Sequence, residues 1–127
     1  MGRGTVWAAT SVHEGPHRVS KAASNVALAP GMILSNEPGY YRAGSFGIRI
    51  ENLLLVTEID IPGSERESYG FETLTLAPYD RNLIDTSMLS QTELEAIDLY
   101  HARVRNELAE HLSDDEASWL ISATAPL

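Results

Sequence analysis

The sequence predicts an α+β protein in which an antiparallel sheet comes first and helices follow. Two observations support this fold class. Residues 33–56 hold two runs of apolar β-formers around a turn that contains glycine, which is typical of a hairpin. Residues 90–127 carry two helix-start signals, each followed by apolar residues at helical spacing. A chain of 127 residues is long enough for a modest core.

The segment before the hairpin offers little regular structure. Residues 1–12 are small and rich in glycine, and residues 13–20 form a polar loop that contains Gly and Pro. Residues 22–31 are rich in small side chains and end in Pro30-Gly31, which is a turn signal. We therefore expect the first strand to begin after this turn.

The hairpin is predicted from two strands, residues 33–41 and 46–56, that are joined by a turn at residues 42–45. A loop is expected from Asp60 to Ser68, because this segment contains a Pro-Gly-Ser run. Residues 71–76 alternate apolar and polar side chains, and this alternation predicts a half-buried strand.

The rest of the chain is predicted to be helical. Residues 90–93 and residues 113–116 are each spaced as a capping box, the signal that opens a helix. The second box opens a short helix with Trp119 and Leu120 on one side, and Pro126 stops it. The residues that share one face of the first helix are Leu94, Ile97, His101, Val104 and Leu108.

Charge and composition restrict the partners and the location. The net charge is −9, and residues 65–127, with four basic and thirteen acidic residues, account for all of it. An acidic half argues against nucleic acid as a partner, because phosphate binding needs a basic face. No apolar run is long enough to span a membrane, and the start has no apolar signal region. Since cysteine is also absent, we expect a cytoplasmic location.

Two carboxylates on the hairpin are the candidate metal ligands. Glu37 precedes Pro38, which biases Glu37 toward an extended conformation and ends the strand just past the carboxylate. Glu51 lies in an apolar strand, where a charged residue is almost never buried unless it is paired. If the strands pair, the two acids converge, and like charges so close need a cation or a proton. A metal ion would meet that need.

Plainer explanations stand beside the metal site. Glu37 could be an exposed acid at a strand end, and Glu51 could form a simple ion pair with Arg49, which shares its strand face. As part of a metal site, Arg49 would instead orient neighbouring groups. Tyr41 could supply a hydroxyl to the same network, although core packing is the commoner role of a tyrosine.

His13 is the other candidate for chemistry. Residues 13–17 match the letters H-E-x-x-H of zinc proteases, but that motif needs a helix so that both histidines share a face. Gly15 and Pro16 oppose such a helix, since a proline in a helix interior costs about 3 kcal/mol. We therefore reject the zinc motif. What remains is a loop histidine, either presented by a rigid turn for hydrogen bonding or proton transfer, or without a special role.

Several spaced motifs, taken together, resemble the pita-bread metallopeptidases, and within them the aminopeptidase P (Xaa-Pro aminopeptidase) family. Residues 12–16 are similar to its V-H-E-G-P loop, residues 30–41 to its P-G-M-x-x-x-x-E-P-G-Y-Y segment, and residues 46–52 to its F-G-I-R-I-E-N segment. Residues 70–85 resemble the C-terminal extension of the long, multi-domain members. The resemblance covers residues 12–127.

This resemblance implies a fold, a division and an activity. The implied fold is a partial pita-bread (creatinase/aminopeptidase) fold, with an antiparallel sheet and a helical C-terminal extension. We expect residues 1–64 to form the C-terminal half of the catalytic domain and residues 65–127 to form the extension. The implied activity is metal-dependent hydrolysis that releases the N-terminal residue from peptides with proline in second position.

The resemblance also implies a centre of two divalent ions, with manganese expected and zinc or cobalt as alternatives. Glu51 would bridge both ions, and Glu37 would bind one ion while handling the proton of the attacking water. His13 would hold the substrate near the scissile bond, and Arg49 and Tyr41 would support the ligands. The residue types agree with this chemistry, since hard oxygen donors suit Mn²⁺ and two metals can activate one water.

The chain departs from the family pattern in its metal ligands. The family centre adds two aspartates, expected upstream of this sequence, and a histidine at the position of Val6. We therefore expect a truncated catalytic half that binds metal weakly and is inactive alone, completed by a complementary N-terminal half. The alternative is a non-catalytic module for dimerisation or interaction. Residues 53–56 are all apolar, so we expect other parts of the protein to cover both faces of that strand. Apolar surface that remains uncovered would favour a homo-oligomer.

Overall fold

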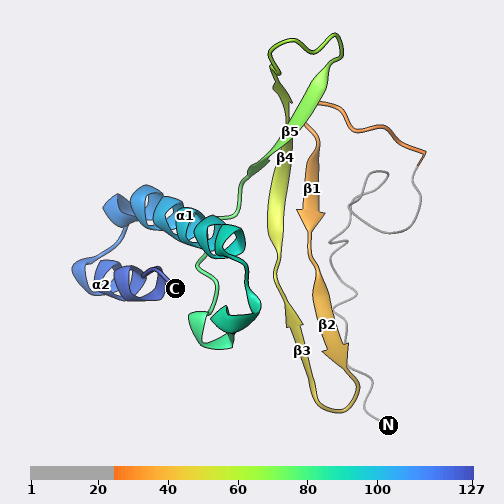
Figure 1. The fold of residues 1–127 in the computed structure, drawn as a ribbon. Coiled ribbons are helices and arrows are strands. Elements are labelled where there is room, and N and C mark those ends of the chain that lie inside the picture. The colour runs from red at the N-terminus through yellow and green to blue at the C-terminus, as the bar shows by residue number, and fades with distance from the viewer. Residues whose placement is uncertain (1–24) are drawn as a thin grey trace, which may run out of the picture. The chain divides into compact units, whose positions relative to one another are not determined.

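The computed structural model describes residues 25–127, in which five strands are followed by two α-helices (Figure 1). The predicted α+β class is confirmed. The strands are β1 (Ile33–Asn36), β2 (Gly39–Arg42), β3 (Phe46–Arg49), β4 (Asn52–Ile59) and β5 (Ser68–Thr73). The helices are α1 (Gln91–Leu108) and α2 (Asp114–Ala123), and short 3₁₀ turns lie at Arg81–Leu83, Thr86–Met88 and Ala109–His111.

All of these strands pair in antiparallel fashion, as predicted. Strand β4 lies between β1 and β5 in a three-stranded sheet, while β2 and β3 form a two-stranded arm. The arm continues the sheet without a shift (Figure 1). Asn36 faces Asn52 at the end of the β1–β4 ladder, and Gly39 faces Arg49 at the start of the β2–β3 ladder, so both ladders share one register.

Each of the two predicted hairpin strands is interrupted once, at residues 37–38 and 50–51. The physical reason is Pro38, which faces Ile50 in the shared register and has no N–H to donate across the ladder. One bond survives there, from the Ile50 N–H to the Pro38 carbonyl at 3.1 Å. The hairpin therefore keeps its register but loses regular pairing beside the two acids.

The predicted turn at the hairpin tip is present. The Ser45 N–H donates to the Arg42 carbonyl at 3.0 Å. Gly44, between them, has a φ of +70°, a conformation that residues with a Cβ rarely adopt. This turn fixes the register of the hairpin from its closed end.

Strand β5 lies closer to the N-terminus than the predicted strand at residues 71–76. Its first residue pairs with Ile59, so the ladder with β4 begins directly after the loop. At the other end the Leu74 N–H still donates to the Leu53 carbonyl at 2.8 Å. The Leu53 N–H instead donates to the Thr75 hydroxyl at 2.8 Å. This side-chain bond takes the place of the next ladder bond and ends the strand.

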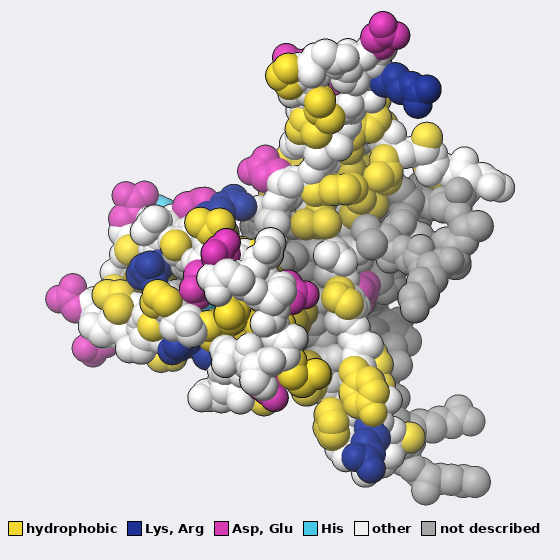
Figure 2. All heavy atoms as spheres, in the orientation of Figure 1, with side chains coloured by type: hydrophobic (Ala, Val, Ile, Leu, Met, Phe, Trp, Pro, Cys, Tyr) yellow, Lys and Arg dark blue, Asp and Glu magenta, His cyan; other side chains and the backbone are white. Residues whose placement is uncertain are grey.

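The chain divides into two compact units, Met1–Thr75 and Leu76–Leu127. In the described part of the first unit, Leu34 and Val56 are the buried hydrophobic residues, on one face of adjoining strands. Hydrophobic side chains also gather on the visible surface of the strands (Figure 2). Those of the sheet that are at least 39% exposed are Ile33, Leu53, Ile59, Tyr69 and Phe71.

The second unit has its core between the two helices. His101 and Val104 of α1 and Leu120 of α2 are all at most 2% exposed. Both predicted capping boxes are present, at residues 90–93 and 113–116. No helix among the described residues has the length and apolarity that a membrane crossing requires.

One expectation for α2 is wrong. Trp119 was expected to lie on the same side as Leu120, but it is 62% exposed while Leu120 is buried. Consecutive residues of an α-helix are about 100° apart around its axis, so the turn that buries Leu120 points Trp119 away from the core.

Candidate metal centre

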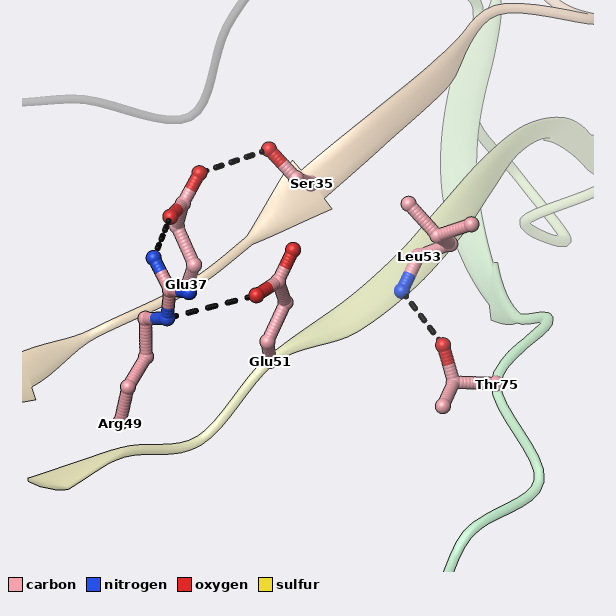
Figure 3. Close-up of polar contacts among 6 residues, drawn as sticks. All are labelled: Ser35, Glu37, Arg49, Glu51, Leu53 and Thr75. Atoms are coloured by element: carbon pink, nitrogen blue, oxygen red, sulfur yellow. Dashed lines mark hydrogen bonds and ion pairs between the residues drawn. The ribbon is translucent and has the colours of Figure 1, made fainter. Parts of the chain in front are cut away.

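The structure brings Glu37 and Glu51 together. The shared register of the two ladders sets Glu37 directly opposite Glu51. Side chains at opposite positions of antiparallel strands leave from the same face, with Cβ atoms about 4.5–5.5 Å apart. The two carboxylates therefore project from one face of the hairpin, at the place where regular pairing is interrupted (Figure 3).

Glu37 and Glu51 form a non-hydrogen-bonded pair of the antiparallel ladder, which brings their side chains close together. A backbone bond runs from the Ile50 N–H to the Pro38 carbonyl, and in an antiparallel ladder such bonds occur at every second pair. The pair of Glu37 and Glu51 is the next one along, so it occupies a non-hydrogen-bonded position, where opposite side chains lie closest. Like charges directly opposite each other are destabilising, so the position calls for a cation.

Arg49 supplies a cation at this position (Figure 3). Its Nη1 lies 2.9 Å from Glu37 Oε2, and its Nε lies 3.3 Å from Glu51 Oε2. The ion pair of Arg49 with Glu51, expected from their spacing, is present, but the same guanidinium also reaches across the hairpin to Glu37. The Arg49 side chain is 47% exposed, whereas the side chains of Glu37 and Glu51 are 20% and 33% exposed.

Ser35 holds Glu37 from the other side. The Ser35 hydroxyl donates to Glu37 Oε1 at 3.0 Å, while Oε2 receives the Arg49 guanidinium. Both oxygens of this carboxylate are thus engaged. Sequence reasoning missed Ser35, although a signal existed, because residues two apart on a strand share a face.

Tyr41 lies on the same face, over two glycines. A Cβ at Gly39 would lie 2.9 Å from the Tyr41 hydroxyl oxygen, and a Cβ at Gly47 would lie 2.7 Å from its Cδ1. Both distances are far inside van der Waals contact, so the ring occupies the space that side chains at these positions would need. Tyr41 is 66% exposed, and Gly39, under its hydroxyl, is the residue opposite Arg49.

The remaining predicted site residue, His13, lies outside the described residues. Within residues 25–127, no three or more His, Asp and Glu side chains are grouped so that they could hold a metal ion. The described part of the site thus offers two opposed carboxylates. Their hard oxygen donors fit a divalent ion such as Mn²⁺, and the other ligands of a complete centre would come from elsewhere.

The second unit contains a fully buried titratable side chain, His101. Its Nε2 accepts the Tyr79 N–H at 3.0 Å, so the proton of the neutral ring is on Nδ1. Within residues 25–127, Nδ1 is buried without a hydrogen-bond partner. Burial lowers the pKa of His101, with smaller opposing and reinforcing effects from Asp98, Arg81 and Arg105. This histidine is neutral and belongs to the core.

Two family models match the chain. The model of metallopeptidase family M24 matches residues 4–58, and that of the C-terminal region of peptidase M24 matches residues 67–127. Aminopeptidase P1 from Lotus japonicus is 42% identical over 120 residues, which cover 92% of this chain. Probable Xaa-Pro aminopeptidase P from Talaromyces marneffei is 42% identical over 128 residues, which cover 96% of it. The chain belongs to metallopeptidase family M24. The resemblance to aminopeptidase P is confirmed.

A solved structure supports the fold of this M24 member. X-prolyl aminopeptidase from Caenorhabditis elegans, a cytosolic enzyme with a di-nuclear active site, matches 91% of the chain with a TM-score of 0.81 and 35% identity. The described antiparallel strands and helices thus form a partial pita-bread fold. The chain spans only about a fifth of these relatives, namely 18%, 20% and 20% of their lengths.

Proposed function

We propose that this chain forms part of a metal-dependent aminopeptidase that releases the N-terminal residue from peptides with proline in second position. The observation that carries the proposal is the opposed pair of Glu37 and Glu51, which lies inside the segment matched by the M24 family model. The relatives named as Xaa-Pro aminopeptidases support the substrate class.

In this proposal Glu37 and Glu51 are metal ligands. Two divalent ions held there would supply Lewis-acid chemistry and an activated water, with manganese expected and zinc or cobalt as alternatives. Glu51 would hold the centre that both ions share. Glu37 would hold one ion, and its carboxylate would take up the proton of the attacking water. The half-buried position of both acids strengthens their electrostatic interactions relative to bulk water.

Three further residues assist the ligands. Without a bound ion, Arg49 neutralises the two carboxylates and keeps them oriented toward the site, as its contacts of 2.9 and 3.3 Å support. Tyr41 covers the same face of the hairpin, with its hydroxyl over Gly39, the residue opposite Arg49 in the ladder. His13 holds the peptide near the scissile bond, as the resemblance of its loop implies.

The centre proposed for this chain alone is incomplete. The resemblance calls for two aspartates and a histidine besides the two glutamates, and Val6 stands at the histidine position. We therefore propose that the isolated chain binds Mn²⁺ weakly and shows no turnover, and that a complementary N-terminal half completes it. We also propose a cytoplasmic location for this chain, because the similar X-prolyl aminopeptidase from C. elegans is a cytosolic enzyme.

We also propose that residues 1–64 belong to the catalytic domain and that residues 65–127 form its C-terminal extension. This division differs from the compact units, which meet after Thr75. The difference has a simple cause, because β5 pairs with β4 and so packs with the first unit although it follows residue 64.

Calorimetric titration with Mn²⁺ and a Xaa-Pro peptide assay test the proposal. We expect weak binding that Glu51→Ala abolishes and that Glu58→Ala, a control at an exposed acid of β4, leaves unchanged. We expect turnover only when a complementary N-terminal half is added, and we expect it to depend on Glu37. Tight binding of two ions by the isolated chain, or turnover that survives Glu37→Ala, would contradict this assignment.

A second candidate is a non-catalytic module for self-association. The β2–β3 arm favours it, because all residues of its two strands are exposed and a two-stranded ladder without a third strand beside it gains little stability in water. The large apolar residues of the arm and the adjoining Ile50, on the face opposite the acids, are 43–63% exposed: Tyr40, Phe46, Ile48 and Ile50. Light scattering after size-exclusion chromatography decides this, and a clean monomer that binds no hydrophobic dye would contradict the module.

A further inference from the structure

We infer that Ser35 is a positioning residue for the Glu37 carboxylate, and that its hydroxyl holds Oε1 so that Oε2 remains for a cation shared with Glu51. The inference rests on the proposed function, because it assigns Ser35 a role at a metal ligand of that site. Its basis is the hydrogen bond from the Ser35 hydroxyl to Glu37 Oε1 at 3.0 Å (Figure 3).

Ser35 lies within the ladder of β1 and β4, whereas Glu37 lies just beyond the end of β1. Ser35 lies within β1, faces Leu53 across the ladder, and follows Leu34, which is 2% exposed in the core. Glu37 lies just beyond the end of β1, where Pro38 interrupts the pairing. A glutamate side chain that is free to rotate loses about 1.5–2 kcal/mol of conformational entropy when it is fixed. A hydroxyl on the neighbour within the ladder therefore reduces the motion that a bound ion would have to suppress.

The two partners of Glu37 act on different oxygens. Ser35 engages Oε1, and Arg49 engages Oε2 and also Glu51 Oε2. Oε2 of Glu37 thus shares its cationic partner with Glu51 Oε2, and an ion shared by both acids would take the place of that partner. Arg49 brings a positive charge that repels such an ion, but the hydroxyl of Ser35 is neutral. Ser35 can therefore keep its hydrogen bond when a cation binds, and Arg49 cannot hold the same oxygen without opposing the cation.

A pair of isosteric substitutions isolates the hydroxyl. Ser35→Thr keeps a hydroxyl, Ser35→Val replaces it with a methyl group, and both introduce the β-branching that suits a strand. Changes in packing are therefore shared by the two variants. Groups that orient metal ligands are typically worth 10–100-fold in metal affinity, so we expect Ser35→Val to weaken Mn²⁺ binding by about tenfold or more. Ser35→Thr should remain within about threefold of the natural chain.

The test is the apparent Kd for Mn²⁺, obtained from the free-ion electron paramagnetic resonance signal with the full chain. Glu37→Ala is measured in parallel, and Ser45→Ala, in the hairpin turn, is the control for a lost hydroxyl elsewhere on the hairpin. If Ser35→Val binds as tightly as Ser35→Thr while Glu37→Ala loses binding, the inference is overturned and the proposed function stands. If Glu37→Ala binds as well as the natural chain, the proposed function fails and the role of Ser35 fails with it.

Discussion

Removing the guanidinium of Arg49 should destabilise the hairpin at the acids. Arg49→Leu keeps an apolar stem but leaves Glu37 and Glu51 facing each other unneutralised. Two partly exposed ion pairs are lost, at 2.9 and 3.3 Å, and each is worth about 0.2–1 kcal/mol. The uncovered repulsion adds about 1 kcal/mol for charges 4 Å apart in water. Because these terms overlap, we expect a net cost of about 1–2 kcal/mol at neutral pH.

Amide hydrogen exchange reports this cost locally. The Ile50 N–H donates to the Pro38 carbonyl beside the acids, so it is the reporter, and a loss of 1–2 kcal/mol speeds its exchange by about 5–30-fold. Adding Glu51→Gln to Arg49→Leu should restore most of the protection, because one like charge is gone. Arg42→Leu, at the hairpin tip, is the matched control. Unchanged exchange in Arg49→Leu, or no recovery in the double variant, would refute this electrostatic account.

Three other predictions concern single contacts. Burial lowers the pKa of His101, so the unfolded state binds the proton at a higher pH than the folded state does. The free energy of unfolding should therefore fall as the pH drops below about 6.5. A urea midpoint that stays constant from pH 8 to 5.5 would contradict this. Gly47→Ala places a Cβ 2.7 Å from the Tyr41 ring and should displace the ring. The displacement would change the NMR chemical shifts of the Tyr41 ring protons, and unchanged shifts would disprove the close contact. Ser90→Ala removes the cap that Glu93 shares and should cost about 1 kcal/mol in chemical denaturation, and no loss would mean that the cap is redundant.

Much of the architecture could be predicted because its signals are local. Both capping boxes are four-residue patterns, and the hairpin is set by a turn and by two adjacent apolar runs. The convergence of Glu37 and Glu51 follows from that pairing alone. The interruption beside them was predicted in part: Pro38 was expected to end the strand just past Glu37, and β1 ends one residue before Glu37.

Other features depend on contacts between distant parts of the chain. The limits of β5 are set by Ile59, where the ladder with β4 begins, and by Thr75, which bonds to Leu53. Alternation of side chains within the segment could not reveal these partners. The exposure of Trp119 depends on which side of α2 the core lies, which a pair of neighbouring apolar residues does not specify.

The arrangement around Arg49 was only half predicted. Its pairing with Glu51 follows from their spacing on one strand. Its reach across to Glu37 depends on the side chain conformation and on the register, and so does the division of the two Glu37 oxygens between Arg49 and Ser35. Spacing along one strand reveals neither.

The most direct test of the central claim is to locate bound Mn²⁺ on the chain by paramagnetic broadening of backbone amide NMR signals. Binding alone would not settle the location, because acids elsewhere, such as those at residues 114–116, also attract cations. We predict that substoichiometric Mn²⁺ broadens the signals of Glu37 and Glu51 first, and that Glu37→Gln with Glu51→Gln removes this effect. Broadening that is strongest at residues 114–116, or that persists at the hairpin in the double variant, would contradict the assignment of these two glutamates as metal ligands.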